Sequence, residues 1–268
     1  MYEAYWGLKE SPFENSPNPK FFYLSPEHEE ALIRMVYAVK QRKGAAMLTG
    51  EYGCGKTTLS RALIQRLEAD RYEVGLLTNP CWNTVEFLRE ILYQLGVESQ
   101  EKAKAELLHR LNEVMYENMR AEKDTVVVID EAHLIDDDAV FEELRLLLNF
   151  QLDDRFLLTL LLIGSPELRD KVRAIRHLDQ RIAIRYHLNM LDSHHTANYI
   201  AHRLRTAGQP RPLFSQEATR QIFDFTRGIP REINNLCDLC LLIGSSKRVQ
   251  EIDEKIVAEV IRDMAGVR

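Results

Sequence analysis

The chain has 268 residues, of which 45% are hydrophobic and 28% are charged, and its formal net charge is −6. This size and composition predict a globular protein with a sizeable core, either one large domain or a domain plus a smaller one. The negative charge argues against a protein that coats nucleic acid without sequence preference, although it is compatible with a local basic patch.

The first 43 residues predict an N-terminal arm followed by a first helix. The segment KESPFENSPNPKFFYLSP is rich in proline and aromatic residues. The N-terminus MYEAYWGLKE has neither the basic start nor the apolar centre of a signal peptide. We expect residues 1–43 to pack on the domain that follows, with the arm extended over it. We also expect a cytoplasmic protein, because the longest apolar run, residues 156–164, is too short to cross a bilayer.

Residues 44–190 alternate between apolar runs and helical patterns. The apolar runs are AAMLTG, YEVGLLTN, TVVVID, LLTLLLIG and IAIRYHL. Continuous apolar strands separated by helices indicate a parallel sheet that is covered on both faces. The fold class is therefore α/β, a three-layer parallel sheet domain.

Residues 191–268 contain only helical patterns. Helix-capping residues precede three of them, at Asp192, Ser215 and Asp253. A small all-helical lid domain is predicted to follow the sheet domain. Within it, Cys237 and Cys240 have CxxC spacing, but there is no second pair and no nearby histidine ligand. We interpret them, with Cys54 and Cys81, as ordinary free cysteines.

The sequence GEYGCGKT has the full GxxxxGK[ST] spacing of a phosphate-binding loop and lies between a predicted strand and a predicted helix. Glycines allow backbone N–H groups to surround phosphates, the lysine supplies a positive charge, and the threonine hydroxyl is a magnesium ligand. We therefore predict binding of ATP and Mg²⁺. The predicted nucleotide-binding residues of this loop are Gly50, Glu51, Tyr52, Gly53, Cys54, Gly55, Lys56, Thr57 and Thr58.

The run TVVVIDEAH places Asp130 and Glu131 at the carboxyl end of a strand, the edge where parallel sheets bind ligands. Asp130 is expected to hold magnesium, and Glu131 to polarise the attacking water. The alternative is that Asp130 and Glu131 are only acidic caps of the following helix. The phosphate loop earlier in the chain favours a role in the nucleotide site. The letters DEAH also occur in helicases, but the chain after Asp192 is too short and too helical for a second motor domain.

Three further polar residues complete the predicted site. Ser165 follows the next apolar strand, where it can hydrogen-bond the attacking water or simply begin a turn. Arg181 precedes the last strand and is our choice for an arginine finger, with Arg185 as the alternative. Arg231 lies in the first helical turn after GIP, where a cation is unfavourable unless an anion is near.

These motifs occur in the order typical of the AAA+ ATPases, and the chain resembles that superfamily from Gly44 to Met264. The arm, LTGEYGCGKTT, GSPEL and GIPREINNLCDLCLL resemble the ExeA or general secretion pathway protein A family over nearly the whole chain. The resemblance implies an ATP-hydrolysing enzyme. Its implied site residues are Lys56, Thr57, Asp130 and Glu131 as the Walker residues, Ser165 and Arg231 as the two sensors, and Arg181 as the finger.

The resemblance also implies partners. We expect a homo-oligomer, either a ring or a filament, acting with secretion or pilus components and recruited to the inner membrane by a partner. The same core is similar to the TnsC or TniB regulators of transposition, so binding to DNA and transposition components is the alternative. The basic cluster Arg169, Lys171, Arg173 and Arg176 motivates it. A nucleotide-gated binding module with little turnover is a third reading.

Overall fold

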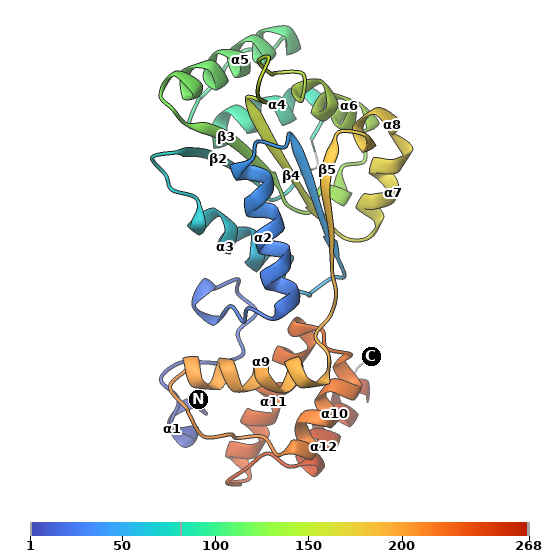
Figure 1. Ribbon diagram of the computed structural model, residues 1–268. Helices are drawn as coiled ribbons and strands as arrows, with labels where there is room; N and C mark the ends of the chain where they lie inside the picture. The colour runs from blue at the N-terminus through green and yellow to red at the C-terminus, as the bar shows by residue number, and fades with distance from the viewer. Residues whose placement is uncertain (1, 81, 267–268) are drawn as a thin grey trace. The chain divides into compact units, whose positions relative to one another are not determined.

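The computed structural model describes residues 2–80 and 82–266, and Figure 1 shows its elements. The chain forms two compact units. The sheet unit comprises residues 27–51 and 59–188, and the helical unit comprises the residues up to Pro26, Tyr52–Thr58 and the residues from Asn189 onward. Both units are therefore assembled from separate stretches of sequence.

The sheet unit contains all five predicted strands. Their bounds are Ala45–Gly50 (β1), Tyr72–Leu77 (β2), Asp124–Ile129 (β3), Leu158–Gly164 (β4) and Ile182–Leu188 (β5). The strand order is β2-β3-β4-β1-β5, and all neighbouring pairs are parallel. The α/β fold class with a parallel sheet is thus confirmed.

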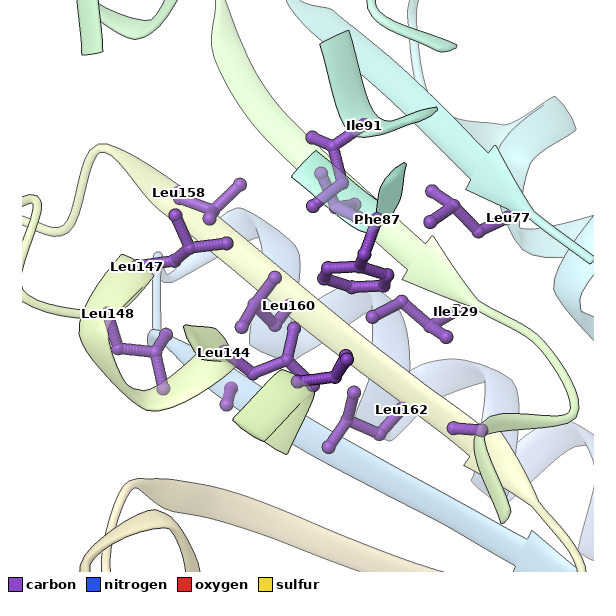
Figure 2. Close-up of a cluster of buried hydrophobic side chains, with 14 of the residues drawn as sticks. Leu77, Phe87, Ile91, Ile129, Leu144, Leu147, Leu148, Leu158, Leu160 and Leu162 are labelled. Carbon is purple, nitrogen blue, oxygen red and sulfur yellow. The ribbon is translucent and has the colours of Figure 1, made fainter. Parts of the chain in front are cut away.

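The sheet is buried on both faces, and each central strand alternates between two apolar layers. The layer formed by α4 (Thr84–Gln94), α5 (Lys104–Arg120) and α6 (Asp138–Leu147) packs on residues such as Ile129 and Leu160. Figure 2 shows Phe87 and Ile91 of α4 directed at these strands. The intervening strand residues, including Val128 and Leu161, are also fully buried. Figure 1 shows α2 (Pro26–Lys40) and α3 (Lys56–Arg66) on that other face.

Local sequence sets the helix starts. Asn83 accepts hydrogen bonds from the backbone N–H groups of Val85 and Glu86, and the Glu86 carboxylate accepts one from Asn83 N–H, which forms a capping box at the start of α4. Asp137 caps α6 in the simpler way, accepting from Ala139 N–H at 2.9 Å. The remaining short elements of this unit are the 3-10 turn Ala132–Leu134 (η2), α7 (Glu167–Ala174) and α8 (Arg176–Asp179).

The helical unit contains the four predicted C-terminal helices. They are α9 (Ser193–Thr206), α10 (Gln216–Thr226), α11 (Pro230–Ser246) and α12 (Glu254–Gly266). The predicted caps Asp192, Ser215 and Asp253 each accept a backbone hydrogen bond from the first turn of their helix. In residues 2–80 and 82–266, no helix is long and apolar enough to cross a membrane.

The N-terminal arm packs differently from the prediction. Its aromatic residues Tyr2, Trp6, Phe13 and Phe21 are buried in the core of the helical unit, together with α9 to α12. The arm is also partly helical, with α1 (Glu3–Trp6) and the 3-10 turn Pro19–Phe21 (η1). The expectation that it extends over the sheet domain is therefore wrong. Aromatic side chains need an apolar partner, and both sheet faces already have their own covering helices.

A polar network fixes the arm to α9 and α11. Trp6 Nε1–H donates to the Leu241 carbonyl at 2.9 Å, and Asn234 Nδ2 donates to Asn15 Oδ1 at 3.0 Å. The buried Arg203 guanidinium donates to the carbonyl oxygens of Pro12 and Glu14. The two Arg203 hydrogen bonds end on backbone carbonyls of the arm, so they fix the course of the arm backbone as well as the burial of its side chains.

The cysteines are structural wherever they are described. Cys54, Cys237 and Cys240 are buried and form no disulfide, and Cys81 lies outside the described residues. Burial raises the pKa of the Cys237 thiol well above its usual range and raises that of the Cys240 thiol to about 12, so both remain protonated at neutral pH. A protonated thiol is a poor metal ligand, and the described residues contain no cluster of three or more His, Cys, Asp or Glu suited to a metal ion.

Candidate nucleotide-binding site

The predicted phosphate loop follows β1 and leads directly into α3, as the sequence pattern requires. Gly53 and Gly55 have positive φ angles of 81° and 102°, a backbone conformation in which side chains are strained. Lys56 is the first residue of α3 and is buried. The positive end of the helix dipole and the backbone N–H groups at a helix start favour an anion such as phosphate at this position.

The polar ends of three neighbouring strands lie at one edge of the sheet. In the register, Thr49 of β1 pairs with Gly164 of β4, and Ile129 of β3 pairs with Leu162 of β4. The chain continues from these strands into Gly50, Ser165 and Asp130 respectively. Strands are spaced about 4.8 Å apart, so the three strand ends span only about 10 Å. Gly50, Asp130 and Ser165 therefore lie at the same carboxyl edge of the sheet within the sheet unit.

Asp130 and Glu131 differ in environment. Asp130 is buried, and its Oδ1 accepts a hydrogen bond from Glu131 N–H at 3.0 Å. Glu131 has a φ of 54°, an uncommon conformation for a residue other than glycine, and it is partly exposed. Residues with strained backbone angles persist only where the surrounding structure holds them, and they are concentrated at functional sites. The geometry separates a buried carboxylate suited to a cation from an accessible one suited to water.

His133 connects Glu131 with Ser165 and was not singled out from the sequence. Its Nδ1 accepts a hydrogen bond from Ser165 N–H at 3.3 Å and lies 3.5 Å from Glu131 Oε2. Gly164 makes room for this contact, because a Cβ there would lie 3.1 Å from the same nitrogen. The sequence signal for His133 is the DEAH motif, in which only Asp130 and Glu131 carry a predicted role. The Ser165 hydroxyl itself donates to the Glu167 carboxylate.

Both finger candidates are held within their own chain. The Arg181 guanidinium donates to the Leu148 carbonyl at 3.2 Å and to Asn149 Oδ1 at 3.0 Å, just beyond α6. Arg185 pairs with Asp179 at 2.8 Å and is more exposed. An arginine that acts on a neighbouring subunit must exchange such contacts for a contact with phosphate. The ion pair of Arg185 with Asp179 is less buried than the hydrogen bonds of Arg181.

Arg231 and the phosphate loop meet inside the helical unit. The Arg231 guanidinium lies over the Tyr52 ring, with its central carbon 4.6 Å from the ring centroid. The backbone N–H of Arg231 also donates to the Gly53 carbonyl at 3.4 Å. The predicted second sensor is therefore in contact with the predicted loop.

The residue types predicted to hold magnesium are those that this ion prefers. Asp130 of the sheet unit offers a buried carboxylate, and Thr57 of the phosphate loop supplies a hydroxyl; both groups are hard oxygen donors. Magnesium is commonly held by one or two protein oxygens, with phosphates and water completing the octahedron. A site without a cluster of three protein ligands is therefore the expected form for magnesium bound with a nucleotide.

A five-stranded parallel sheet with a phosphate loop after β1 and an acidic pair after β3 defines a P-loop nucleotide-binding protein. The family model for the AAA domain matches residues 39–172, half of the chain. The chain belongs to this AAA family.

General secretion pathway protein A of Aeromonas hydrophila is 37% identical over 272 residues, a match that includes the whole chain. The resemblance to the ExeA family is thereby confirmed. The chain spans about half the length of this curated relative, 49%.

Solved structures support the fold. The Aeropyrum pernix ORC2 protein matches with a TM-score of 0.68 and 18% identity, over 95% of this chain and 71% of that one. Cdc6p from Pyrobaculum aerophilum matches with a TM-score of 0.69 and 17% identity, over 94% and 70%. The RuvB branch migration motor of Thermotoga maritima gives 0.59 and 18%, over 87% and 68%. At these identities the likeness concerns the fold alone.

Proposed function

We propose that the chain binds ATP with magnesium and hydrolyses it. The observation that supports this most is the register of β3, β4 and β1, which brings the acidic pair, Ser165 and the start of the phosphate loop to one sheet edge. Lys56 would bind the β and γ phosphates, and Thr57 and Asp130 would hold magnesium, which neutralises phosphate charge when bound.

Glu131 is the proposed general base. Its carboxylate accepts a proton from the attacking water as the oxygen of that water approaches the γ-phosphate. His133, 3.5 Å from Glu131 Oε2, and the Ser165 backbone bonded to it limit where this carboxylate can lie. The left-handed backbone conformation of Glu131 further restricts the position of its carboxylate.

Two variants test binding and turnover separately. Lys56→Ala removes a charge-assisted contact and is expected to weaken ATP binding about tenfold or more, whereas Glu131→Gln retains binding and lowers kcat at least about a hundredfold. Lys255→Ala and Glu106→Gln, at exposed helix positions, are the matched controls. Unchanged affinity in Lys56→Ala would refute the phosphate-loop assignment, and unchanged turnover in Glu131→Gln would refute the base.

We further propose that ATP promotes assembly of a ring or filament, with Arg181 acting on the nucleotide of the next subunit and Arg185 as the alternative. A side chain bonded to Leu148 and Asn149 can also support the subunit surface, so the two roles must be distinguished. Light scattering without nucleotide, with ADP and with a slowly hydrolysed ATP analogue measures assembly. A trans-acting finger predicts that Arg181→Ala or Arg185→Ala loses turnover while still assembling. A protein that stays monomeric in all three conditions would refute the proposal.

The name of the Aeromonas hydrophila relative places that protein in the general secretion pathway. We propose that this chain likewise serves a secretion or pilus system, with recruitment to the inner membrane by a partner. Purification from cells with its cross-linked partners tests this. Recovery of transposition components in place of secretion components would favour the alternative.

One observation favours DNA binding as a second candidate function. Arg173 and Arg176 are exposed at the end of α7 and the start of α8, whereas Lys171 pairs with Asp136 at 2.9 Å. Drosophila ORC, a structural neighbour at 16% identity, is described as bound to DNA. Each phosphate contact contributes about one to the slope of log affinity against log salt. Arg173→Ala should reduce that slope with ATP present, whereas Arg220→Ala on α10 should not.

A further inference from the structure

The phosphate loop and the first turn of α11 pack tightly at Gly53. A Cβ built on Gly53 would lie 3.0 Å from both Arg231 Cβ and Ile229 Cγ2. The Arg231 backbone N–H donates to the Gly53 carbonyl at 3.4 Å, so backbone and side chain are both engaged. This close approach fixes the position of the Arg231 Cα relative to the loop within the helical unit.

The Arg231 side chain is oriented by Tyr52. The guanidinium carbon is 4.6 Å from the ring centroid, within the range of a favourable cation–π contact. Tyr52 is 65% exposed, so burial of its own apolar surface does not explain an aromatic residue at this loop position. A guanidinium has five N–H donors, so a contact of its central carbon with the ring is compatible with hydrogen bonds from these donors to phosphate oxygens.

We propose that Tyr52 is the positioning residue for Arg231, and that through this pair the loop distinguishes ATP from ADP. This inference rests on the proposed function. A cation in the first turn of α11 is disfavoured by the helix dipole, so Arg231 needs a local partner to remain there. A guanidinium that is held in place before the nucleotide arrives loses less rotamer entropy on binding. The smaller entropy loss strengthens binding of ATP, which has the additional phosphate for Arg231 to contact, more than binding of ADP.

The test is a set of nucleotide affinities measured by calorimetry for ADP and a non-hydrolysable ATP analogue. Tyr52→Leu removes the ring and is expected to weaken binding of the ATP analogue about two- to fivefold more than it weakens binding of ADP. Tyr52→Phe keeps the ring and should retain the wild-type ratio of the two affinities. Tyr93→Leu, the same change at an exposed tyrosine of α4, is the control.

A double-variant cycle completes the test. In an Arg231→Ala background, Tyr52→Leu should have no further effect, because the ring then has no guanidinium to position. An equal loss for both nucleotides, a loss in Tyr52→Phe as large as that in Tyr52→Leu, or a full effect in the Arg231→Ala background would overturn the inference. Absence of any nucleotide binding by the wild-type protein would instead refute the proposed function, and this inference with it.

Discussion

Gly228, two residues before α11, is the position where a single methyl group should have the largest structural effect. Its φ is 76°, and a Cβ there would lie 1.8 Å from the Leu191 carbonyl oxygen. Gly228→Ala therefore combines left-handed backbone strain of about 1–2 kcal/mol with displacement of packed backbone, about 1–3 kcal/mol. Leu191 N–H donates to the Gly228 carbonyl at 3.1 Å, and loss of this bond costs about 1 kcal/mol more. The expected loss of unfolding free energy is about 3–6 kcal/mol.

Urea unfolding measures this loss, and Trp6 fluorescence in a Trp82→Phe background reports on the helical unit. Gly7→Ala is the control in the same unit, because Gly7 also has a positive φ, 68°, but its nearest neighbour to a new Cβ is a side-chain atom at 3.5 Å. The unfolding free energy of Gly7→Ala should therefore decrease only by the backbone strain, about 1–2 kcal/mol. Equal losses in the two variants would refute the argument from the carbonyl clash.

Three further predictions concern particular side chains. Arg203→Leu should lower the unfolding free energy of the helical unit by about 2–4 kcal/mol in urea titrations, because it leaves arm carbonyls without donors; a loss below about 1 kcal/mol would contradict this. His202 has a pKa lowered by burial and by the positive charges of two nearby arginines, so its unfolded form binds more protons in mildly acidic solution. Stability should therefore fall as pH decreases below about 6.5, and His202→Gln should flatten that dependence. His133→Ala should lower kcat about fivefold with nucleotide affinity unchanged, through loss of the acceptor for a backbone N–H; an affinity change without a kcat change would contradict it.

The sheet was predictable because its strands are buried on both faces. A run such as TVVVID has few structural alternatives between two amphipathic helices, and the structure places β3 at Asp124–Ile129. The same reasoning predicted which strand ends share an edge, since parallel strands all present their carboxyl ends there. The relation of Gly50, Asp130 and Ser165 thus followed from the sequence pattern alone.

Partners across long sequence separations could not be predicted in this way. The aromatic residues of the arm indicate burial, but hydrophobic burial is not directional, so it does not specify which surface covers Trp6. The contact of Arg231 with the Tyr52 ring depends on a close approach of the phosphate loop and the first turn of α11, which local propensity does not encode. His133 was missed for a related reason, since its partner Ser165 belongs to a different strand end.

The packing of the arm has a consequence for synthesis of the protein. Trp6 and its partner Leu241 are separated by 235 residues, so the ribosome makes the arm long before the helices that bury it. At about 5–20 residues per second, the aromatic side chains of the arm wait on the order of ten to fifty seconds for that partner. During this interval they form an exposed apolar segment of the nascent chain, which is the kind of segment that chaperones bind. The sheet unit, whose last strand ends at Leu188, can complete its core in that time, and the helical unit must then close around a segment made well before its own helices.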